Sequence, residues 1–165
     1  MNDSFSSYLN DHLAGATAAI ETLQLLRDQH PGKPIAGFAL EMMGQLREDR
    51  TVLQNLIDRI GRGPSPLKQA AGWVGARVSE LKFTPDSYGM FLALEALSLG
   101  VEGRLLMWQA AQAMVDNHPA LQTLAFENLV ERARKQRAEI ELQRMLLGEV
   151  AFAPLPVAVP SPTSL

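Results

Sequence analysis

Residues 89–108, GMFLALEALSLGVEGRLLMW, form the stretch that decides the fold. Apolar side chains lie almost all the way round a helix drawn through it, but one row carries Glu95, Ser98, Glu102 and Gln109. A helix that is hydrophobic nearly all round is normally central in its domain. Carboxylates on such a helix need partners, because burying an unpaired charge is costly. The stretch therefore predicts a central helix whose acidic row faces other helices.

The composition is that of one soluble domain, since 165 residues suffice to bury a core. The net charge of −3 argues against a general nucleic-acid binder, which would carry a basic surplus. The absence of cysteine excludes disulfides and thiolate metal sites. The opening MNDSFSSYLNDHL lacks the pattern of a signal peptide, and no run approaches the ~18 apolar residues of a membrane span. We therefore expect a cytoplasmic protein without membrane contact.

Proline, glycine and capping residues divide the chain into five helical segments. We expect these segments at residues 4–29, 34–60, 66–81, 84–117 and 119–147. No stretch alternates as a strand does, so the predicted class is all-α. Short loops make the first two and the last two segments antiparallel neighbours, and the shorter middle segment carries the chain back between the two hairpins. Residues 1–150 would form this bundle, and residues 151–165 a proline-rich tail.

Two stretches carry a resemblance to a known family: YLNDHLAGATAAIE at residues 8–21 and LALEALSLGVEGRLLMW at residues 92–108. Over roughly residues 4–147 the chain resembles the ferritin-like four-helix-bundle family. The resemblance implies a bundle of two antiparallel hairpins with one long crossover, a fold that often holds a di-iron centre. Such centres use Glu-x-x-His pairs, and this chain has none: Gly44 follows Glu41 at that spacing, and Val130 follows Glu127. The resemblance thus implies the fold more than the activity.

One polar layer is predicted inside the bundle. At 100° per residue, His12 and Asp49 fall within the apolar stripes of the first and second segments, and Gln136 within that of the fifth. Counting from the turns brings Asp49 level with the neighbourhood of Glu102. It also brings Glu102 level with the stretch between Arg132 and Gln136. The four long helices are therefore expected to share a polar layer where a ferritin-like bundle keeps its metal.

Two interpretations of this layer stay open. In the first, His12, Asp49 and Glu102 are metal ligands, since an imidazole and two carboxylates suit iron, manganese or zinc. In the second, the same three side chains form a self-neutralising network with Arg132 or Gln136 and hold no metal. A two-iron oxidase would need more ligands than this layer supplies, so whether the chain is an enzyme stays undecided.

Two classes of function follow from these interpretations. The first is a ferritin-like protein with a degenerate di-iron site that binds iron or manganese in redox or stress chemistry. The second is a non-catalytic helical module for oligomerisation or protein interaction. Apolar residues outside the expected stripes predict self-association as a homodimer. These residues are Trp73, Phe83, Leu155, Val157 and Val159.

Overall fold

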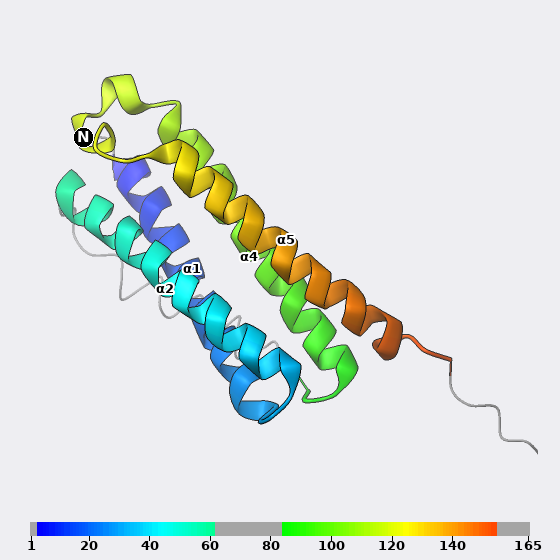
Figure 1. Cartoon of the computed structure of the whole chain (residues 1–165). Helices are drawn as coiled ribbons and strands as arrows, with labels where there is room; N and C mark the ends of the chain where they lie inside the picture. The colour runs from blue at the N-terminus through cyan, green and yellow to red at the C-terminus, as the bar shows by residue number, and fades with distance from the viewer. Residues whose placement is uncertain (1–2, 62–83, 155–165) are drawn as a thin grey trace, which may run out of the picture.

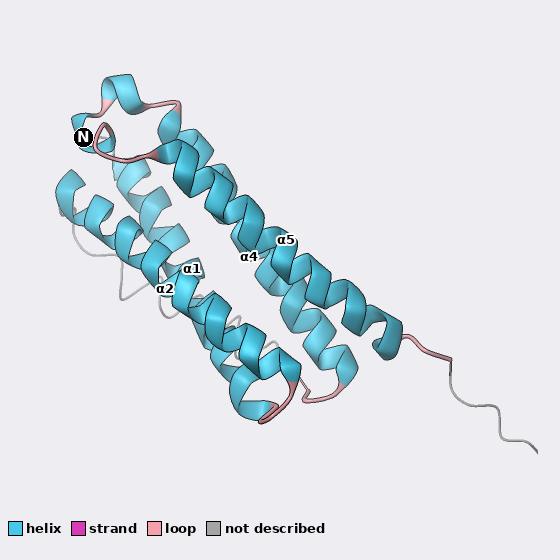
Figure 2. Ribbon diagram, viewed as in Figure 1, coloured by secondary structure: helices cyan, strands magenta, loops and turns pink. Residues whose placement is uncertain are grey.

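The computed structural model describes residues 3–61 and 84–154 of the chain. These residues form four long α-helices and no strand (Figure 2). The helices are α1 (Asp3–Gln29), α2 (Pro34–Ile60), α4 (Ser87–Gln112) and α5 (Phe126–Ala151). The all-α prediction is confirmed for this part of the chain. The expected crossover helix at residues 66–81, with Trp73, and the tail with Leu155, Val157 and Val159 lie outside the described residues, as does Phe83.

The four helices lie lengthwise beside one another (Figure 1). α1 packs on α2, α4 packs on α5, and α1 also packs on α4. Followed by its colours in Figure 1, the chain runs along α1 and returns along α2 after a short turn. α4 then runs in the same direction as α2, and α5 returns beside α4. The apolar faces of all four helices meet in one core.

That core is built largely from leucine and methionine side chains that are fully buried. In α1, α2 and α5 these residues recur at helical spacing along one apolar stripe, whereas α4 is apolar on nearly every side. None of the helices in the two described ranges is both long and apolar enough to cross a membrane. The largest fully buried side chains are those of Leu9, Leu23, Met42, Met43, Leu46, Leu53, Leu56, Leu94, Leu97, Met107, Trp108 and Leu121.

The turn between α1 and α2 matches its sequence signals. Gly32 has a φ of 75°, a backbone conformation that residues with a side chain rarely adopt, and Pro34 occupies the first turn of α2. The buried ring of His30 fastens this turn to the start of α4. Its Nδ1 lies 2.8 Å from the carbonyl oxygen of Leu26, and its Nε2 lies 3.1 Å from that of Pro85.

The start of α4 differs by two residues from the expectation. Asp86, rather than Thr84, is the N-cap, because its carboxylate accepts the backbone N–H of Gly89 at 2.7 Å. The hydroxyl of Thr84 donates to the same carboxylate at 2.7 Å. These two hydrogen bonds hold the pKa of Asp86 below its usual value, the Gly89 N–H being the larger cause.

The connection between α4 and α5 is longer than the sequence indicated. α4 ends at Gln112 instead of near Asn117, and α5 begins at Phe126 instead of Pro119. Two short 3₁₀ turns, Val115–Asn117 and Pro119–Leu121, fill the interval. Leu121 is fully buried, so this connection closes one end of the core. A proline after a capping residue is consistent with a helix start, but here it begins only a single turn.

Candidate functional site

The polar centre of the bundle is Asp49 on α2, whose side chain is only 3% exposed. It lies on the buried stripe of α2 between Leu46 and Leu53, so helical phase alone carries it inward. Its Oδ2 lies 3.2 Å from a guanidinium nitrogen of Arg104, which comes from α4 and is itself 8% exposed. A buried carboxylate and a buried guanidinium therefore neutralise each other across two helices.

Gln136 of α5 joins this pair from a third helix. Its side chain is fully buried, and its amide nitrogen donates to Oδ2 of Asp49 at 2.9 Å. Its amide oxygen accepts a hydrogen bond from Arg104. The amide can do both because it carries a donor and an acceptor on one group. Gln136 thus bridges the acid and the base of the pair.

Arg132 completes the arrangement at its rim. It lies one turn before Gln136 on α5, is 36% exposed, and pairs with Oδ1 of Asp49. Its other terminal nitrogen lies 3.5 Å from the exposed carboxylate of Glu48. We call Asp49, Arg104, Arg132 and Gln136 the interior charge layer. Both carboxylate oxygens of Asp49 are engaged within it.

Burial and neighbouring charges act together on the guanidinium of Arg104. Burial lowers the pKa of Arg104, the negative charge of Asp49 opposes that effect, and the positive charge of Arg132 adds to it. A guanidinium starts from so high a pKa that it stays protonated in proteins. Among the members of the layer there is no hydroxyl, thiol or amine that could act as a nucleophile. Its chemistry is that of a structural ion-pair network.

The structure places two of the candidate ligands outside this layer. Glu102 pairs with Arg137 of α5 at 2.9 Å, and both side chains are more than a third exposed. With Arg104 pointing inward, a residue two positions earlier is turned by about 200° on the helix. The expectation that Glu102 lies level with Asp49 inside the bundle is therefore not met, because its helical phase turns it toward the α4–α5 flank.

His12 occupies a third environment. Its ring is half-buried and packs edge-on against Tyr8, with ring centroids 4.6 Å apart. The ring also lies beside the backbone of α4 at Gly103, where a Cβ would stand 3.9 Å from it. Burial lowers the pKa of His12, and the nearby charge of Asp11 offsets part of that effect. His12 therefore serves as packing between α1 and α4.

A metal does not fit the interior charge layer as these residues form it. A cation beside Asp49 would stand next to two guanidinium groups and compete with both for one carboxylate. Across residues 3–61 and 84–154, no three His, Cys, Asp or Glu side chains gather as metal ligands would. We derive no reaction through a metal, and the uptake of iron or manganese by the chain stays a prediction.

The acidic row of α4 finds its partners on α5. Arg144 binds Glu95 at 3.4 Å and Glu141 at 2.8 Å, and it lies over the ring of Phe91 at 5.1 Å from the centroid. Arg144 first, and then the hydroxyl of Ser98, lower the pKa of Glu141. The row is therefore a seam of ion pairs along the α4–α5 contact, and it explains why acids occur on so apolar a helix.

Two functional side chains were missed by the sequence analysis. Arg104 shares its buried face with Val101, Leu105 and Trp108. Glu102 also has leucines three and four residues away, so helical spacing did not single Arg104 out. His30 is 8% exposed, and its ring links the α1–α2 turn to the start of α4. It left no local signal, because its partner carbonyl group lies 55 residues away in the sequence.

Comparison with known proteins adds no relative to this picture. No protein-family model, no curated protein and no solved structure matches the chain.

Proposed function

We propose that this chain is a helical bundle of the ferritin-like arrangement that has become a non-catalytic, self-associating module. Three features support the arrangement: α1 and α2 are neighbours, α4 and α5 are neighbours, and α4 runs in the same direction as α2. In place of a metal centre, the bundle interior holds the interior charge layer. Its role in this proposal is to fix the register of three helices.

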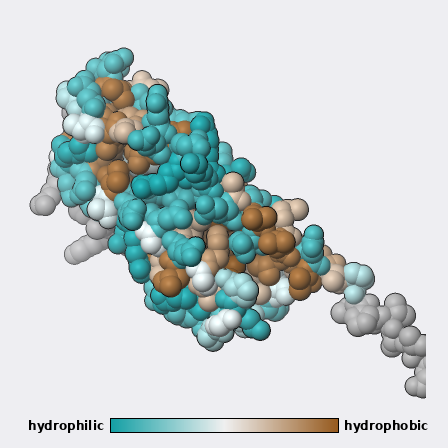
Figure 3. All heavy atoms as spheres, viewed as in Figure 1, coloured by the Kyte–Doolittle hydropathy of each residue, from teal (hydrophilic) through white to brown (hydrophobic). Residues whose placement is uncertain are grey.

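The observation that carries the proposal is an apolar face on the C-terminal half of α5. Leu142, Met145, Leu146 and Val150 are each more than half exposed, and their spacing places them on one side of the helix. Figure 3 displays this apolar area over that end of α5. Scattered exposed leucines are ordinary, but a contiguous row on one helix marks an interaction surface.

The occupant that fits this face best is a second copy of α5 lying antiparallel to the first. Along its outer side, α5 carries Lys135, Ala138, Leu142, Met145 and Glu149, all exposed and separated alternately by three and four residues. That alternation is the spacing of a coiled-coil seam, with apolar residues at its three central positions. Lys135 lies seven residues before Leu142, and Glu149 lies seven residues after it.

An antiparallel copy centred on Leu142 therefore brings Lys135 of each chain opposite Glu149 of the other. The pairing is isologous, as a two-fold dimer requires. Leucine meets leucine at the centre, alanine allows close approach beside it, and opposite charges meet at both ends. Each of these matches comes from the order of residues on one helix.

Sedimentation equilibrium of the wild-type protein tests the proposal. We expect the apparent mass to rise from 18.1 kDa toward twice that value as the concentration rises from the micromolar to the submillimolar range. Leu142→Glu should keep the protein monomeric. Leu40→Glu, at an equally exposed leucine on α2, is the matched control and should associate as the wild type does.

Charge exchange tests the orientation. Lys135→Glu alone should weaken association, and the double variant Lys135→Glu/Glu149→Lys should restore it. A wild-type mass of 18.1 kDa at every concentration would contradict self-association. Equal disruption by Leu40→Glu, or no recovery in the double variant, would contradict the α5 interface.

A further inference from the structure

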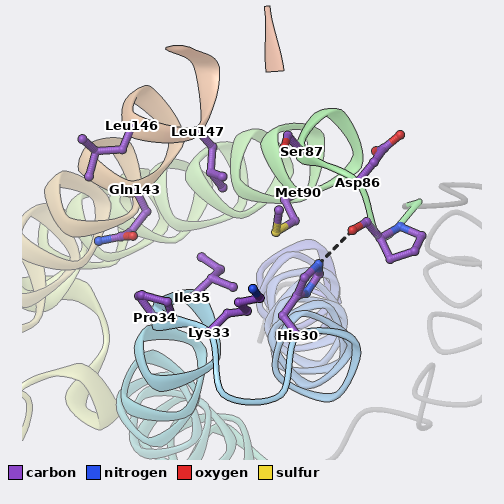
Figure 4. Close-up of a pocket in the computed structure, with 11 residues that line it drawn as sticks. His30, Lys33, Pro34, Ile35, Asp86, Ser87, Met90, Gln143, Leu146 and Leu147 are labelled. Carbon is purple, nitrogen blue, oxygen red and sulfur yellow. Dashed lines mark hydrogen bonds between the residues drawn. The ribbon is translucent and has the colours of Figure 1, made fainter. Parts of the chain in front are cut away.

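A cavity of about 500 Å³ opens at the end of the bundle where the α1–α2 turn, the start of α4 and the second half of α5 come together (Figure 4). Its volume falls within the range of small-molecule sites, ~300–1,000 Å³. It shares no member with the interior charge layer. Its apolar lining consists of Pro34, Ile35, Pro85, Met90, Leu146 and Leu147.

The cavity has two charged residues in its lining, Lys33 and Asp86. The amino group of Lys33 is directed over the cavity toward Met90 in Figure 4. Lys33 forms no ion pair with any residue in the described ranges, although an ammonium group offers three donors. Asp86 is the acid of the lining, and its carboxylate is turned away and already accepts from Gly89 and Thr84.

The remaining polar side chains of the lining are those of His30, Ser87 and Gln143. The ring of His30 is held by the carbonyl oxygens of Leu26 and Pro85, which engage both of its nitrogens. Gln143 and Ser87 each present a group that can donate a hydrogen bond. The cavity thus combines an apolar body with one ammonium group that forms no ion pair within the described residues, one carboxylate that is turned away, and two neutral donors.

We propose that this cavity binds a small amphipathic monocarboxylate, with its aliphatic part against Ile35, Met90 and Leu147 and its carboxylate at Lys33. The assignment rests on charge complementarity. An amphipathic amine of the same length would bring its charge beside Lys33, and an alcohol would leave the ammonium unpaired. The cavity shares Leu146 with the apolar face of α5, but Leu142 and Met145, which lie at the centre of the proposed dimer seam, do not line it.

The test is an NMR titration of protein carrying ¹³C-methyl methionine, with octanoate as the probe. The Met90 methyl signal, identified by its loss in Met90→Leu, should shift and saturate in the millimolar range or below. Octylamine should leave it unchanged. Lys33→Gln should weaken octanoate binding about fivefold, the effect expected for one partly exposed ion pair.

Arg47→Gln is the control variant, because Arg47 is an exposed cation of α2 that does not line the cavity. It should bind octanoate as the wild type does. The proposal is overturned if the Met90 signal does not saturate with octanoate, if octylamine binds as well, or if Lys33→Gln and Arg47→Gln change the affinity equally.

Discussion

Replacing Asp49 by asparagine is the most informative single change in the interior charge layer. The change removes the layer's buried negative charge and leaves Arg104, at 8% exposure, without a counter-charge. Breaking a buried pair by removing one partner costs ~3–5 kcal/mol. Asparagine keeps the volume and an oxygen that can still accept a hydrogen bond, so we expect the lower end, about 3 kcal/mol. Arg132 adds little to this loss, because at 36% exposure it can turn toward water.

Urea unfolding followed by circular dichroism measures this loss. With a slope of ~1–3 kcal/mol/M for a small domain, the midpoint of Asp49→Asn should fall by about 1–3 M. Arg132→Met is the control at the rim of the same layer and should cost no more than ~1 kcal/mol. One low protein concentration should be used throughout, because association would add stability of its own. If Asp49→Asn loses less than ~0.5 kcal/mol, the buried pair does not stabilise the fold as argued.

Three further outcomes are expected. Gly89→Ala should lower the free energy of unfolding by at least ~1 kcal/mol in the same urea assay, because a Cβ there would clash with the backbone of Thr84 and displace the Asp86 cap. Gly100→Ala is the control and should be neutral or stabilising, because a Cβ there meets open space. Burial lowers the pKa of His12 below its ordinary value of 6.5, so the unfolded chain binds the proton more readily than the folded protein does. The free energy of unfolding should therefore fall as pH drops from about 7.5 through 6.5. In urea titrations, His12→Gln should show a weaker dependence of this free energy on pH. Neither a chelator nor added iron(II) or manganese(II) should change the melting temperature. A metal that binds the folded state would raise it, so a rise with added metal would restore the metal interpretation.

The helices themselves were predictable because local signals agree with the packing. Pro34 after the Gly32 turn marks the start of α2, and the buried stripe from Ile35 to Ile60 follows the helical period closely. The α4–α5 connection was less predictable. Pro119 carries the signal of a helix start, but burial of Leu121 holds the chain in a single turn there, and α5 begins only at Phe126. That burial depends on the whole bundle and is not encoded nearby.

Members of the interior charge layer could be predicted on helices whose apolar and polar faces differ clearly. Asp49 on α2 and Gln136 on α5 interrupt clear apolar stripes, and both are buried as expected. α4 lacks such contrast, because apolar residues surround it on nearly every side. Its helical phase could not be read from hydrophobicity, so Glu102 was placed inside and Arg104 was overlooked. In the structure Arg104 lies inside the bundle beside Asp49, and Glu102 lies on the exposed flank beside Arg137.

The central claim is that Asp49 and Arg104 hold each other inside the bundle, and a double-mutant cycle of Asp49→Asn and Arg104→Met measures it directly. The free energies of unfolding of the wild type, both single variants and the double variant give the coupling between the two residues. We predict a coupling of at least ~1.5 kcal/mol, with the double variant more stable than the sum of the single losses allows, because removing both charges leaves neither one buried alone. Losses that add to within ~0.5 kcal/mol would contradict the claim, since additivity is the behaviour of residues that do not interact.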